Sequence, residues 1–426
     1  MAIFQKQKKN QRSEVLAAID IGTSKICCAI ARPIQTANKT QVQILGFGQQ
    51  ASKGVRNGAI IDLEQLEDAI VNAVHTAEQS AERNIRSVFI NLPTPAVQLH
   101  RLTTKTSLSG HTINDQHIHK LIKSSRDFEN IRDRQIIHII PTTYNLDEAT
   151  GILDPRGMVG DTLQAKLSVL TTPTGLIRNI SSCMARCHLD IDGFVAGGYA
   201  SGLSTLVEDE KSLGATIIDI GGGSTTLASF IDGALIDLAS IPIGGEHVTK
   251  DIARVLATPV SQAERLKNLY GTLLPISEND RESIMIPQLG ENADHATPSV
   301  SKFYLSEIIR ARVEEIFEYV KKRMNTSNID KLAYQRIVLT GGVSQLSGIR
   351  ELASDKLGGQ VRIGVPNNLF GDSESMNVPL FSTCAGLLQF GIVDQQNYNQ
   401  AELIQANLSA SNNIFSKTVN WVRENF

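Results

Sequence analysis

Hydrophobic residues in this chain form short runs between polar turns, and one such pattern occurs twice. Apolar runs flank a turn at residues 20–25, and a second pair of runs flanks a turn at 219–225. Each pattern predicts two strands joined by a tight turn. Because the two units lie far apart in the sequence, we expect two similar half-molecules. The apolar runs are residues 15–19, 26–31, 215–218 and 227–231.

Other segments carry apolar residues at helical spacing. In the segment 63–81, Leu66, Ile70, Val74 and Ala77 recur every three or four residues, which predicts an amphipathic helix. A chain that mixes such helices with short strands belongs to the α/β class. The other predicted helices are 114–128, 248–255, 261–270, 305–324 and 348–357, and the other predicted strands are 42–47, 87–92, 134–146 and 336–339.

Both repeated turns begin with an aspartate and continue with glycine: Asp20-Ile-Gly-Thr-Ser-Lys and Asp219-Ile-Gly-Gly-Gly-Ser-Thr. Glycine lets the backbone turn at positive φ and approach a phosphate closely, so that successive turn amides donate to its oxygens. An aspartate at a strand end can hold a metal-bound water. A third glycine turn, at 340–345, is of the kind that passes an adenosine. The three turns together predict a nucleotide site in a cleft.

Composition narrows the class of protein. With 426 residues, 41% of them hydrophobic, the chain is long enough for at least two domains. A formal net charge of −3, without a basic block interleaved with aromatics, disfavours nucleic acid as a partner. Five cysteines are an odd count that suits a reducing cytoplasm better than a disulfide framework.

The end of the sequence has a different composition. Residues 395–413 are rich in Gln, Asn and Ser and are predicted to be a disordered linker. Residues 414–426 predict an amphipathic helix that is too short to span a bilayer but can lie among lipid headgroups. The alternative is a tail helix docked on this protein or on a partner. The predicted membrane-binding residues are Ile414, Phe415, Val419, Trp421, Val422 and Phe426.

The three turns, in this order, resemble the phosphate-1, phosphate-2 and adenosine elements of the actin, Hsp70 and sugar-kinase superfamily. The segments 141–147, 155–160 and 244–252 resemble the FtsA family of bacterial division proteins. The resemblance covers nearly the whole chain. It implies an α/β actin-like ATPase fold, with two RNase H-like domains around a nucleotide cleft, in which a subdomain 1C replaces the usual subdomain 1B.

The resemblance also implies how the chain is divided. The expected boundaries are 13–86, 167–197 and 378–394 for subdomain 1A, 87–166 for subdomain 1C, 198–240 and 302–377 for subdomain 2A, 241–301 for subdomain 2B, 395–413 for the linker and 414–426 for the membrane helix.

Carried over to matching positions, the resemblance implies ATP and Mg²⁺ as ligands. Asp20 and Asp219 would hold metal-bound waters, while Glu264 and Lys267 would reach the ribose hydroxyls. The phosphates would be bound by Asp20, Gly22, Thr23, Ser24, Lys25, Asp219, Gly221, Gly222, Gly223 and Ser224, and the adenosine by Gly341, Gly342 and Ser344.

One departure from the superfamily limits the expected chemistry. Actin-like hydrolases carry a glutamine or glutamate that positions the attacking water, in the region that here spans 194–200. No such side chain is present in this segment, and a phosphoryl transfer without an oriented nucleophile loses much of its rate. We therefore predict no catalytic residue and at most a weak ATPase.

The family resemblance implies an ATP-binding, filament-forming adaptor at the cytoplasmic face of the bacterial inner membrane, at the division septum. Its expected partners are the C-terminal peptide of FtsZ, lipids, further copies of the chain and later division proteins. Lys302, Arg310 and Arg312 are candidates to bind the acidic FtsZ peptide, although each also fits a solvated helix charge. Two alternatives remain, a sugar or metabolite kinase and an Hsp70-like chaperone ATPase.

Overall fold

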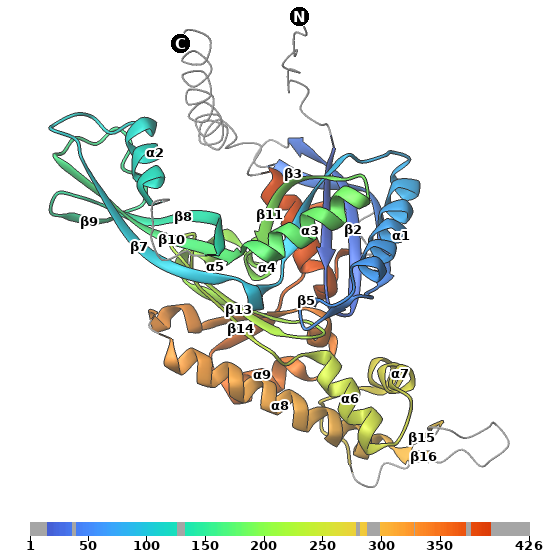
Figure 1. The fold of residues 1–426 in the computed structure, drawn as a ribbon. Coiled ribbons are helices and arrows are strands. Elements are labelled where there is room, and N and C mark those ends of the chain that lie inside the picture. The colour runs from blue at the N-terminus through green and yellow to red at the C-terminus, as the bar shows by residue number, and fades with distance from the viewer. Residues whose placement is uncertain are drawn as a thin grey trace, which may run out of the picture.

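The computed structural model describes residues 15–35, 40–125, 133–277, 282–287, 299–327, 329–371 and 376–392 (Figure 1). The predicted linker and membrane helix lie outside these residues. Among the described residues, no helix combines the length and the apolar character needed to cross a bilayer.

The first large sheet has six strands in the order β11-β6-β1-β2-β3-β19. β1 and β2 are the two strands that flank the first glycine turn, and they pair antiparallel. β6 and β11 continue the sheet in parallel, whereas β3 continues it antiparallel. The strands are β1 (Leu16–Ile21), β2 (Lys25–Gln35), β3 (Thr40–Ala51), β6 (Ser87–Leu92), β11 (Asp190–Ala196) and β19 (Leu369–Gly371).

Alternation along β1 places this sheet between two layers of helices. Ala17 and Ile19 face the core that contains α1 (Leu63–Ala81) and α3 (Thr174–Arg186). Leu16 and Ala18 point to the other face and pack against residues 381–392. Because successive side chains of a strand point to opposite faces, a strand buried on both sides is apolar throughout.

The second large sheet repeats this topology. Its order, β14-β13-β12-β17-β18, has an antiparallel pair around the second glycine turn and two parallel strands beyond it. The prediction of two similar halves is confirmed by this correspondence. The strands are β12 (Ala215–Ile220), β13 (Thr225–Ile231), β14 (Ala234–Ile241), β17 (Arg336–Thr340) and β18 (Gln360–Ile363).

Helices cover both faces of the second sheet as well. Ile218 and Ile220 pack with α6, α8 and α9, whereas Ile217 and Phe230 face the opposite core. Gly202 of α4 approaches Phe230 so closely that an added Cβ would lie 2.4 Å from its ring. The helices of this half are α4 (Gly197–Thr205), α5 (Glu208–Leu213), α6 (Gly245–Val255), α7 (Val260–Tyr270), α8 (Lys302–Thr326) and α9 (Ile349–Leu357), with the short strands β15 (Ser283–Met285) and β16 (Ser299–Ser301) beside them.

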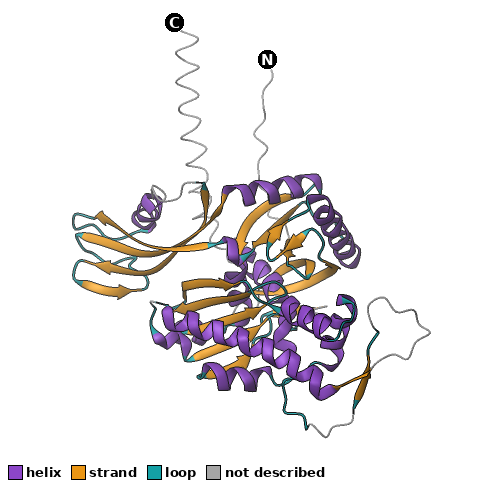
Figure 2. Cartoon of the chain, turned by 60° about the horizontal axis from the view of Figure 1, so that its bottom comes forward, coloured by secondary structure: helices purple, strands orange, loops and turns teal. Residues whose placement is uncertain are grey.

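A third, smaller sheet extends to one side of the two larger ones (Figure 2). Its order is β7-β10-β8-β9, and α2 (Asp115–Ser124) packs on it. The strands are β7 (Gln98–Ser107), β8 (Arg134–Leu146), β9 (Ala149–Ile152) and β10 (Thr162–Pro173).

Two strands lie outside the subdomains in which the expected boundaries placed them. The inserted subdomain was expected to start at residue 87, but Ser87–Leu92 is β6 of the first large sheet, and the small sheet starts at Gln98. Likewise β19 pairs with β3 of the first half, although 302–377 was expected to belong to the second. In both cases pairing to a distant strand decides the location, and the local sequence does not show it.

Candidate functional site

A cavity of about 1080 Å³ lies between the two large sheets. Its wall contains both repeated glycine turns, the third glycine turn and part of α7. The structure therefore brings together segments that are far apart in the sequence. The predicted nucleotide residues on the wall are Asp20, Gly22, Thr23, Ser24, Lys25, Asp219, Gly221, Gly222, Gly223, Ser224, Glu264, Lys267, Gly341 and Gly342.

The two repeated turns have the same local hydrogen bond and face each other. In the first turn Gly22 N donates to Lys25 O at 3.0 Å, and in the second Gly221 N donates to Ser224 O at 3.0 Å. An added Cβ on Gly222 would lie 3.0 Å from Ser24 Cβ. Glycine at this position therefore lets the two turns approach closely enough to act on one ligand.

The two aspartates lie at the ends of β1 and β12, where Asp20 is buried and Asp219 is partly buried. Asp20 is 8% exposed, and burial raises its pKa to about 6, against the opposing effect of the positive charge of Lys25. Burial also raises the pKa of Asp219, while hydrogen bonds from Ser201 and Thr383 act to lower it. A cation in the cavity would stabilise both carboxylates in the charged form.

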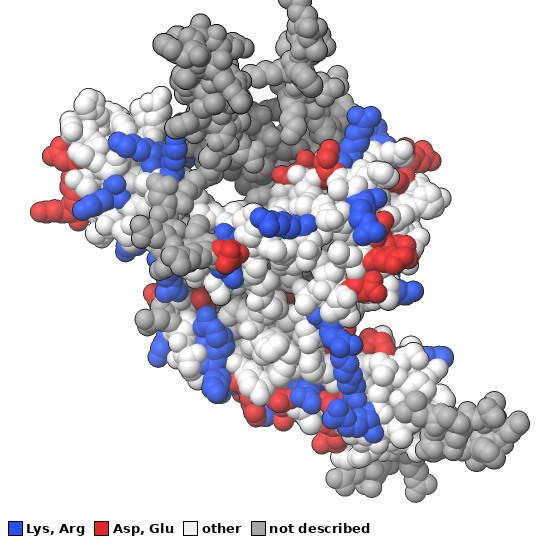
Figure 3. All heavy atoms as spheres, in the orientation of Figure 1, with Lys and Arg blue, Asp and Glu red and all other residues white. Residues whose placement is uncertain are grey.

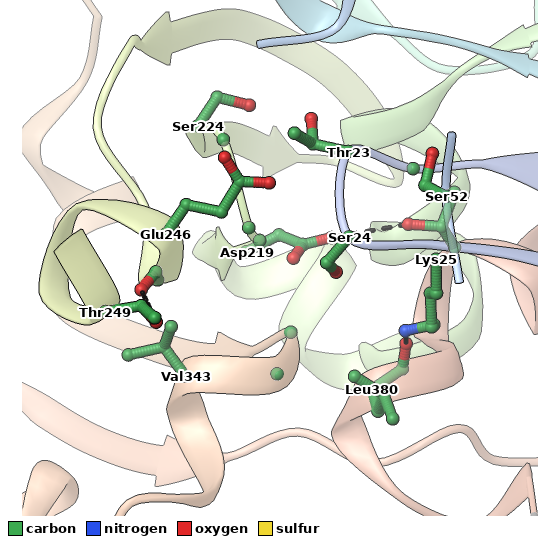
Figure 4. Close-up of a pocket in the computed structure, with 18 of the residues that line it drawn as sticks. Thr23, Ser24, Lys25, Ser52, Asp219, Ser224, Glu246, Thr249, Val343 and Leu380 are labelled. Atoms are coloured by element: carbon green, nitrogen blue, oxygen red, sulfur yellow. Dashed lines mark hydrogen bonds between the residues drawn. The ribbon is translucent and has the colours of Figure 1, made fainter. Parts of the chain in front are cut away.

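Lys25 supplies a positive charge close to both aspartates, and its side chain contacts the C-terminal part of the described chain. Its Nζ donates to Leu380 O at 2.5 Å and lies 4.8 Å from the centroid of the Phe381 ring. Figure 4 shows this side chain on the same cavity wall as Ser24 and Ser52. The ammonium group is therefore held in place before any ligand binds.

The third turn requires glycine for two reasons. Gly341 has φ of 84°, and an added Cβ would lie 2.4 Å from Asp219 Oδ1. Of the residues predicted to contact the nucleotide, Ser344 is the one that does not line the cavity, and its hydroxyl donates to Gly341 O at 2.7 Å. The side chain of Ser344 thus closes the turn, and its contact with the adenosine stays a prediction.

The predicted ribose residues form a hydrogen-bonded cluster on α7 and α6. Lys267 Nζ donates to Glu264 Oε2 at 2.7 Å and to Thr249 Oγ1 at 2.8 Å. Burial acts to raise the pKa of Glu264, but the charge and hydrogen bond of Lys267, with hydrogen bonds from Thr249 and Asn268, outweigh it, so the pKa is lowered. Glu264 is therefore a charged acceptor on the cavity wall.

Sequence reasoning missed several residues on the cavity wall and one behind it. Asn91, on the wall, accepts from Ile21 N at 2.7 Å and so fixes the first turn. Thr383, also on the wall, and the buried Ser201 behind it contact Asp219. Glu246, at the start of α6, also lies on the wall. The one sequence signal close to these residues was the pair Gly244-Gly245, which directly precedes Glu246.

The three cations predicted to bind a partner are already engaged on α8. Lys302 pairs with Glu282 at 2.8 Å, and Arg310 lies 3.6 Å from Glu314. Arg312 binds both carboxylate oxygens of Asp251, at 2.5 and 3.1 Å. Figure 3 shows basic and acidic side chains near one another at the right and along the lower edge of the face it draws, around a largely uncharged middle.

The described residues contain no group of three or more His, Cys, Asp or Glu that would hold a metal ion without further ligands. A magnesium ion needs near-octahedral oxygen coordination and is commonly held by one or two carboxylates, substrate phosphates and waters. Asp20 and Asp219, which line the cavity from its two halves, fit that second arrangement.

Comparison with known proteins places these features in a family. Residues 216–386 match the family described as Cell division protein FtsA, and residues 96–171 match the SHS2 domain inserted in FTSA. The chain is 36% identical to Cell division protein FtsA of Rhizobium meliloti (strain 1021), over 98% of this chain and 96% of the relative. It is 30% identical to that of Pseudomonas aeruginosa, over 98% and 99% of the two chains.

Solved structures show the same fold at low sequence identity. The structure of a PilM-PilN type IV pilus biogenesis complex has a TM-score of 0.63 at 16% identity, covering 90% of this chain and 99% of that chain. MreB5 of Spiroplasma citri bound to AMPPNP has a TM-score of 0.56 at 12% identity, covering 92% and 100% of the two chains. The fold is actin-like, as predicted. Because these relatives match the chain over nearly the full length of both, the chain belongs to the FtsA family of cell division proteins.

Proposed function

We propose that this chain is an ATP-binding, actin-like adaptor of cell division that polymerises and holds FtsZ filaments at the cytoplasmic membrane. The observation that carries the proposal is the pair of glycine turns that face each other across one cavity. Backbone amides and Lys25 are suited to phosphate oxygens, and the carboxylates of Asp20 and Asp219 are suited to a metal.

The ligand that fits this cavity is a nucleoside triphosphate with Mg²⁺. Gly22, Ser24 and Lys25 from one half, with Gly222 and Gly223 from the other, would bind the phosphates. Asp20 and Asp219 would hold magnesium through waters, and the bound ion would neutralise phosphate charge. Glu264 and the third glycine turn would contact the nucleoside. The related fold of Spiroplasma citri MreB5 was solved with AMPPNP, which supports this assignment.

Polymerisation would make weak membrane binding effective. Residues 414–426 carry Lys417 and Arg423 against Glu424, so attraction of a single tail to anionic lipid is slight. Subunits linked in a filament present many tails at high effective concentration, and their combined affinity rises steeply. Closure of the cleft on ATP would fix the two halves in the geometry that polymerises.

The partner side of the proposal rests on family membership. We propose that the acidic C-terminal peptide of FtsZ docks near α8 and subdomain 2B, and that subdomain 1C contacts later division proteins. Because Lys302, Arg310 and Arg312 are already paired, a peptide would have to exchange these internal ion pairs for its own. Arg312 is the least available of the three, because Asp251 binds its Nε and Nη2 and Glu315 binds its Nη1.

The nucleotide assignment is tested with Gly342→Asp. Gly342 lines the cavity, so a carboxylate at this position should repel phosphate, while the added Cβ would meet only the flexible end of Leu380, at 3.0 Å. Gly175→Asp is the matched control, because an added Cβ there has no neighbour within 4 Å. Fluorescence titration should show at least tenfold weaker ATP binding for Gly342→Asp alone. Equal affinity in both variants would overturn the assignment.

The membrane assignment is tested by sedimentation with liposomes of anionic and neutral lipid. The full chain is compared with a chain that ends at Asn413, each with and without ATP. We expect ATP-dependent pelleting of the full chain and little of the shortened one. Trp421→Ala in the full chain should lie between them, since it removes one large apolar anchor. Equal pelleting of all three chains would contradict the proposal.

A further inference from the structure

Glu246 lines the cavity, although the sequence did not predict a role for it there. It is the second residue of α6, and the start of this helix is tied to the second glycine turn. Gly245 N donates to Gly221 O at 2.8 Å, and Glu246 N donates to Gly222 O at 2.8 Å. In Figure 4 the side chain rises from α6 into the cavity, below Ser224 and beside Asp219, with Thr23 to its right.

Four carboxylates line the described part of the cavity wall, and Glu246 differs from the other three. Asp20 is buried at a strand end, Asp219 accepts from Ser201, and Glu264 accepts from Lys267. Among the residues that the structure describes, the side chain of Glu246 is paired with Lys250 alone, at 3.4 Å, and the side chain of that lysine is 52% exposed. An ion pair of this kind is weak, so the acceptor capacity of Glu246 remains available in the cavity.

A carboxylate at this place is unfavourable for simple phosphate binding. Both phosphate and carboxylate are negative, and a partly enclosed cavity strengthens their repulsion compared with bulk water. The group therefore needs a role that offsets this cost. The region expected to orient the attacking water supplies only Gly197 and Gly198 to the wall, and glycine has no side chain for that task.

We propose that the Glu246 carboxylate orients the water that attacks the terminal phosphate of a bound nucleotide. The inference rests on the proposed nucleotide site. The water oxygen forms a bond to the γ-phosphorus while the bond from that phosphorus to the β–γ bridging oxygen breaks. ADP leaves with the electron pair of that bond, inorganic phosphate keeps the hydroxyl, and the remaining water proton goes to solvent. Glu246 accepts a hydrogen bond from the water, which holds its lone pair toward phosphorus.

The test compares Glu246→Ala, Glu246→Gln and Glu246→Asp with the wild-type chain. Two quantities are measured for each: the dissociation constant for ATP with and without Mg²⁺, and the rate of single-turnover hydrolysis. Glu208→Ala is the control, because it removes a carboxylate of a surface ion pair on α5, where the Glu208 side chain is 89% exposed.

We expect Glu246→Ala to hydrolyse ATP at least tenfold more slowly while binding it as tightly as the wild type or severalfold more tightly. Glu246→Gln keeps an acceptor oxygen at the same reach and should stay within about threefold of the wild-type rate. Glu246→Asp is one methylene shorter and should be as slow as the alanine variant. Glu208→Ala should match the wild type in both measurements.

Two outcomes would overturn the inference. The first is a wild-type hydrolysis rate no higher than that of Glu246→Ala. The second is a tenfold loss of ATP affinity in Glu246→Ala that appears only with Mg²⁺, which would assign Glu246 to the metal. Absence of nucleotide binding by the wild-type chain would instead remove the proposed function itself, and the inference with it.

Discussion

Ser201 donates its hydroxyl to Asp219 Oδ2 across 2.6 Å, from the buried face of α4 to the end of β12. The same hydroxyl lies 2.9 Å from Thr383 Oγ1, in the helical residues 382–392. A carboxylate at the second glycine turn is thus oriented by two other segments of the chain. Hydrogen bonds to the charged form favour ionisation, so these hydroxyls counteract the effect of burial on the pKa of Asp219.

Ser201→Ala should weaken ATP binding in the presence of Mg²⁺, and the loss should grow as the pH falls from 8 to 6. Without the donor the pKa of Asp219 rises further, and a protonated carboxyl holds a metal-bound water poorly. The unfolding free energy should fall by about 1–3 kcal/mol. Fluorescence titration at several pH values, with urea unfolding, measures both effects.

Ser204→Ala is the matched control for this prediction. Ser204 is also buried on α4, and its hydroxyl donates to Ser382 O at 2.7 Å rather than to a carboxylate. It should lose similar stability and leave the pH dependence of ATP binding unchanged. A steeper pH dependence in both variants would show that packing of α4, and not the bond to Asp219, is responsible.

Gly341→Ala should cost more stability than Gly358→Ala. Both glycines have positive φ, 84° and 76°, so alanine is strained at each by about 1 kcal/mol. An added Cβ at Gly358 has no neighbour within 4 Å, whereas at Gly341 it would meet Asp219 Oδ1 at 2.4 Å. The difference in unfolding free energy between the variants isolates the clash. Equal losses would mean that Asp219 moves aside at little cost.

The sequence predicted the parts of the site that depend on backbone shape. The turns at 20–25 and 219–225 need glycine for close approach, and glycine is visible without a structure. The sequence around Ser201 indicates only a packed helix, and its contact with Asp219 becomes visible in the fold. Glu246 is equally inconspicuous, because its role depends on how α6 is tied to Gly222.

The fold shows the same division between local and distant information. The helix predicted over 63–81 matches α1 (Leu63–Ala81), since its apolar face and its N-cap Asp62 are local signals. Strand β6 was placed in the wrong sheet, because its pairing with β1 depends on residues about seventy positions away. The membrane tail lies outside the described residues and stays a prediction.

His138→Phe should remove a pH dependence of stability. His138 is buried between the rings of Tyr199 and Phe390, at centroid distances of 5.5 and 5.2 Å, and burial lowers its pKa to about 4. The unfolded chain then binds more protons than the folded one between about pH 4 and 6.5. Stability from this group is present above pH 6.5 and is lost as the pH falls, by about 3 kcal/mol in total.

Urea unfolding across this window checks the prediction. The difference between wild type and His138→Phe should rise from pH 4 to 6.5 and then level off. His75→Phe is the control, because it makes the same change on the exposed face of α1. A flat difference curve for His138→Phe would show that the buried imidazole accepts a proton without cost.

Asp20→Asn should stabilise the nucleotide-free protein at pH 7.5 and have little effect near pH 4. Burial raises the pKa of Asp20 from 3.8 to about 6, so the folded state binds more protons than the unfolded state in that window. Stability from Asp20 is therefore fully present below about pH 4 and is lost as the pH rises through 6, on the order of 2–3 kcal/mol. The asparagine variant has no charge to bury and avoids this loss.

Adding ATP with Mg²⁺ should make the wild type more stable than Asp20→Asn, the reverse of the order without ligand. A cation beside Asp20 stabilises its charged form, and ligand binding to the folded state adds stability in proportion to affinity. The wild type should gain stability on adding the ligand, and Asp20→Asn should gain little. Thermal melts at pH 7.5 with and without MgATP measure this, with Asp209→Asn on exposed α5 as control.

The two buried groups must be separated by difference curves. His138 makes stability rise with pH between about 4 and 6.5, and Asp20 makes it fall between about 4 and 6, so their contributions largely cancel in the wild type. A nearly flat wild-type curve is therefore expected even if both effects are real. Subtracting each variant from the wild type should give slopes of opposite sign. Slopes of the same sign would mean that one of the two pKa shifts has been assigned in the wrong direction.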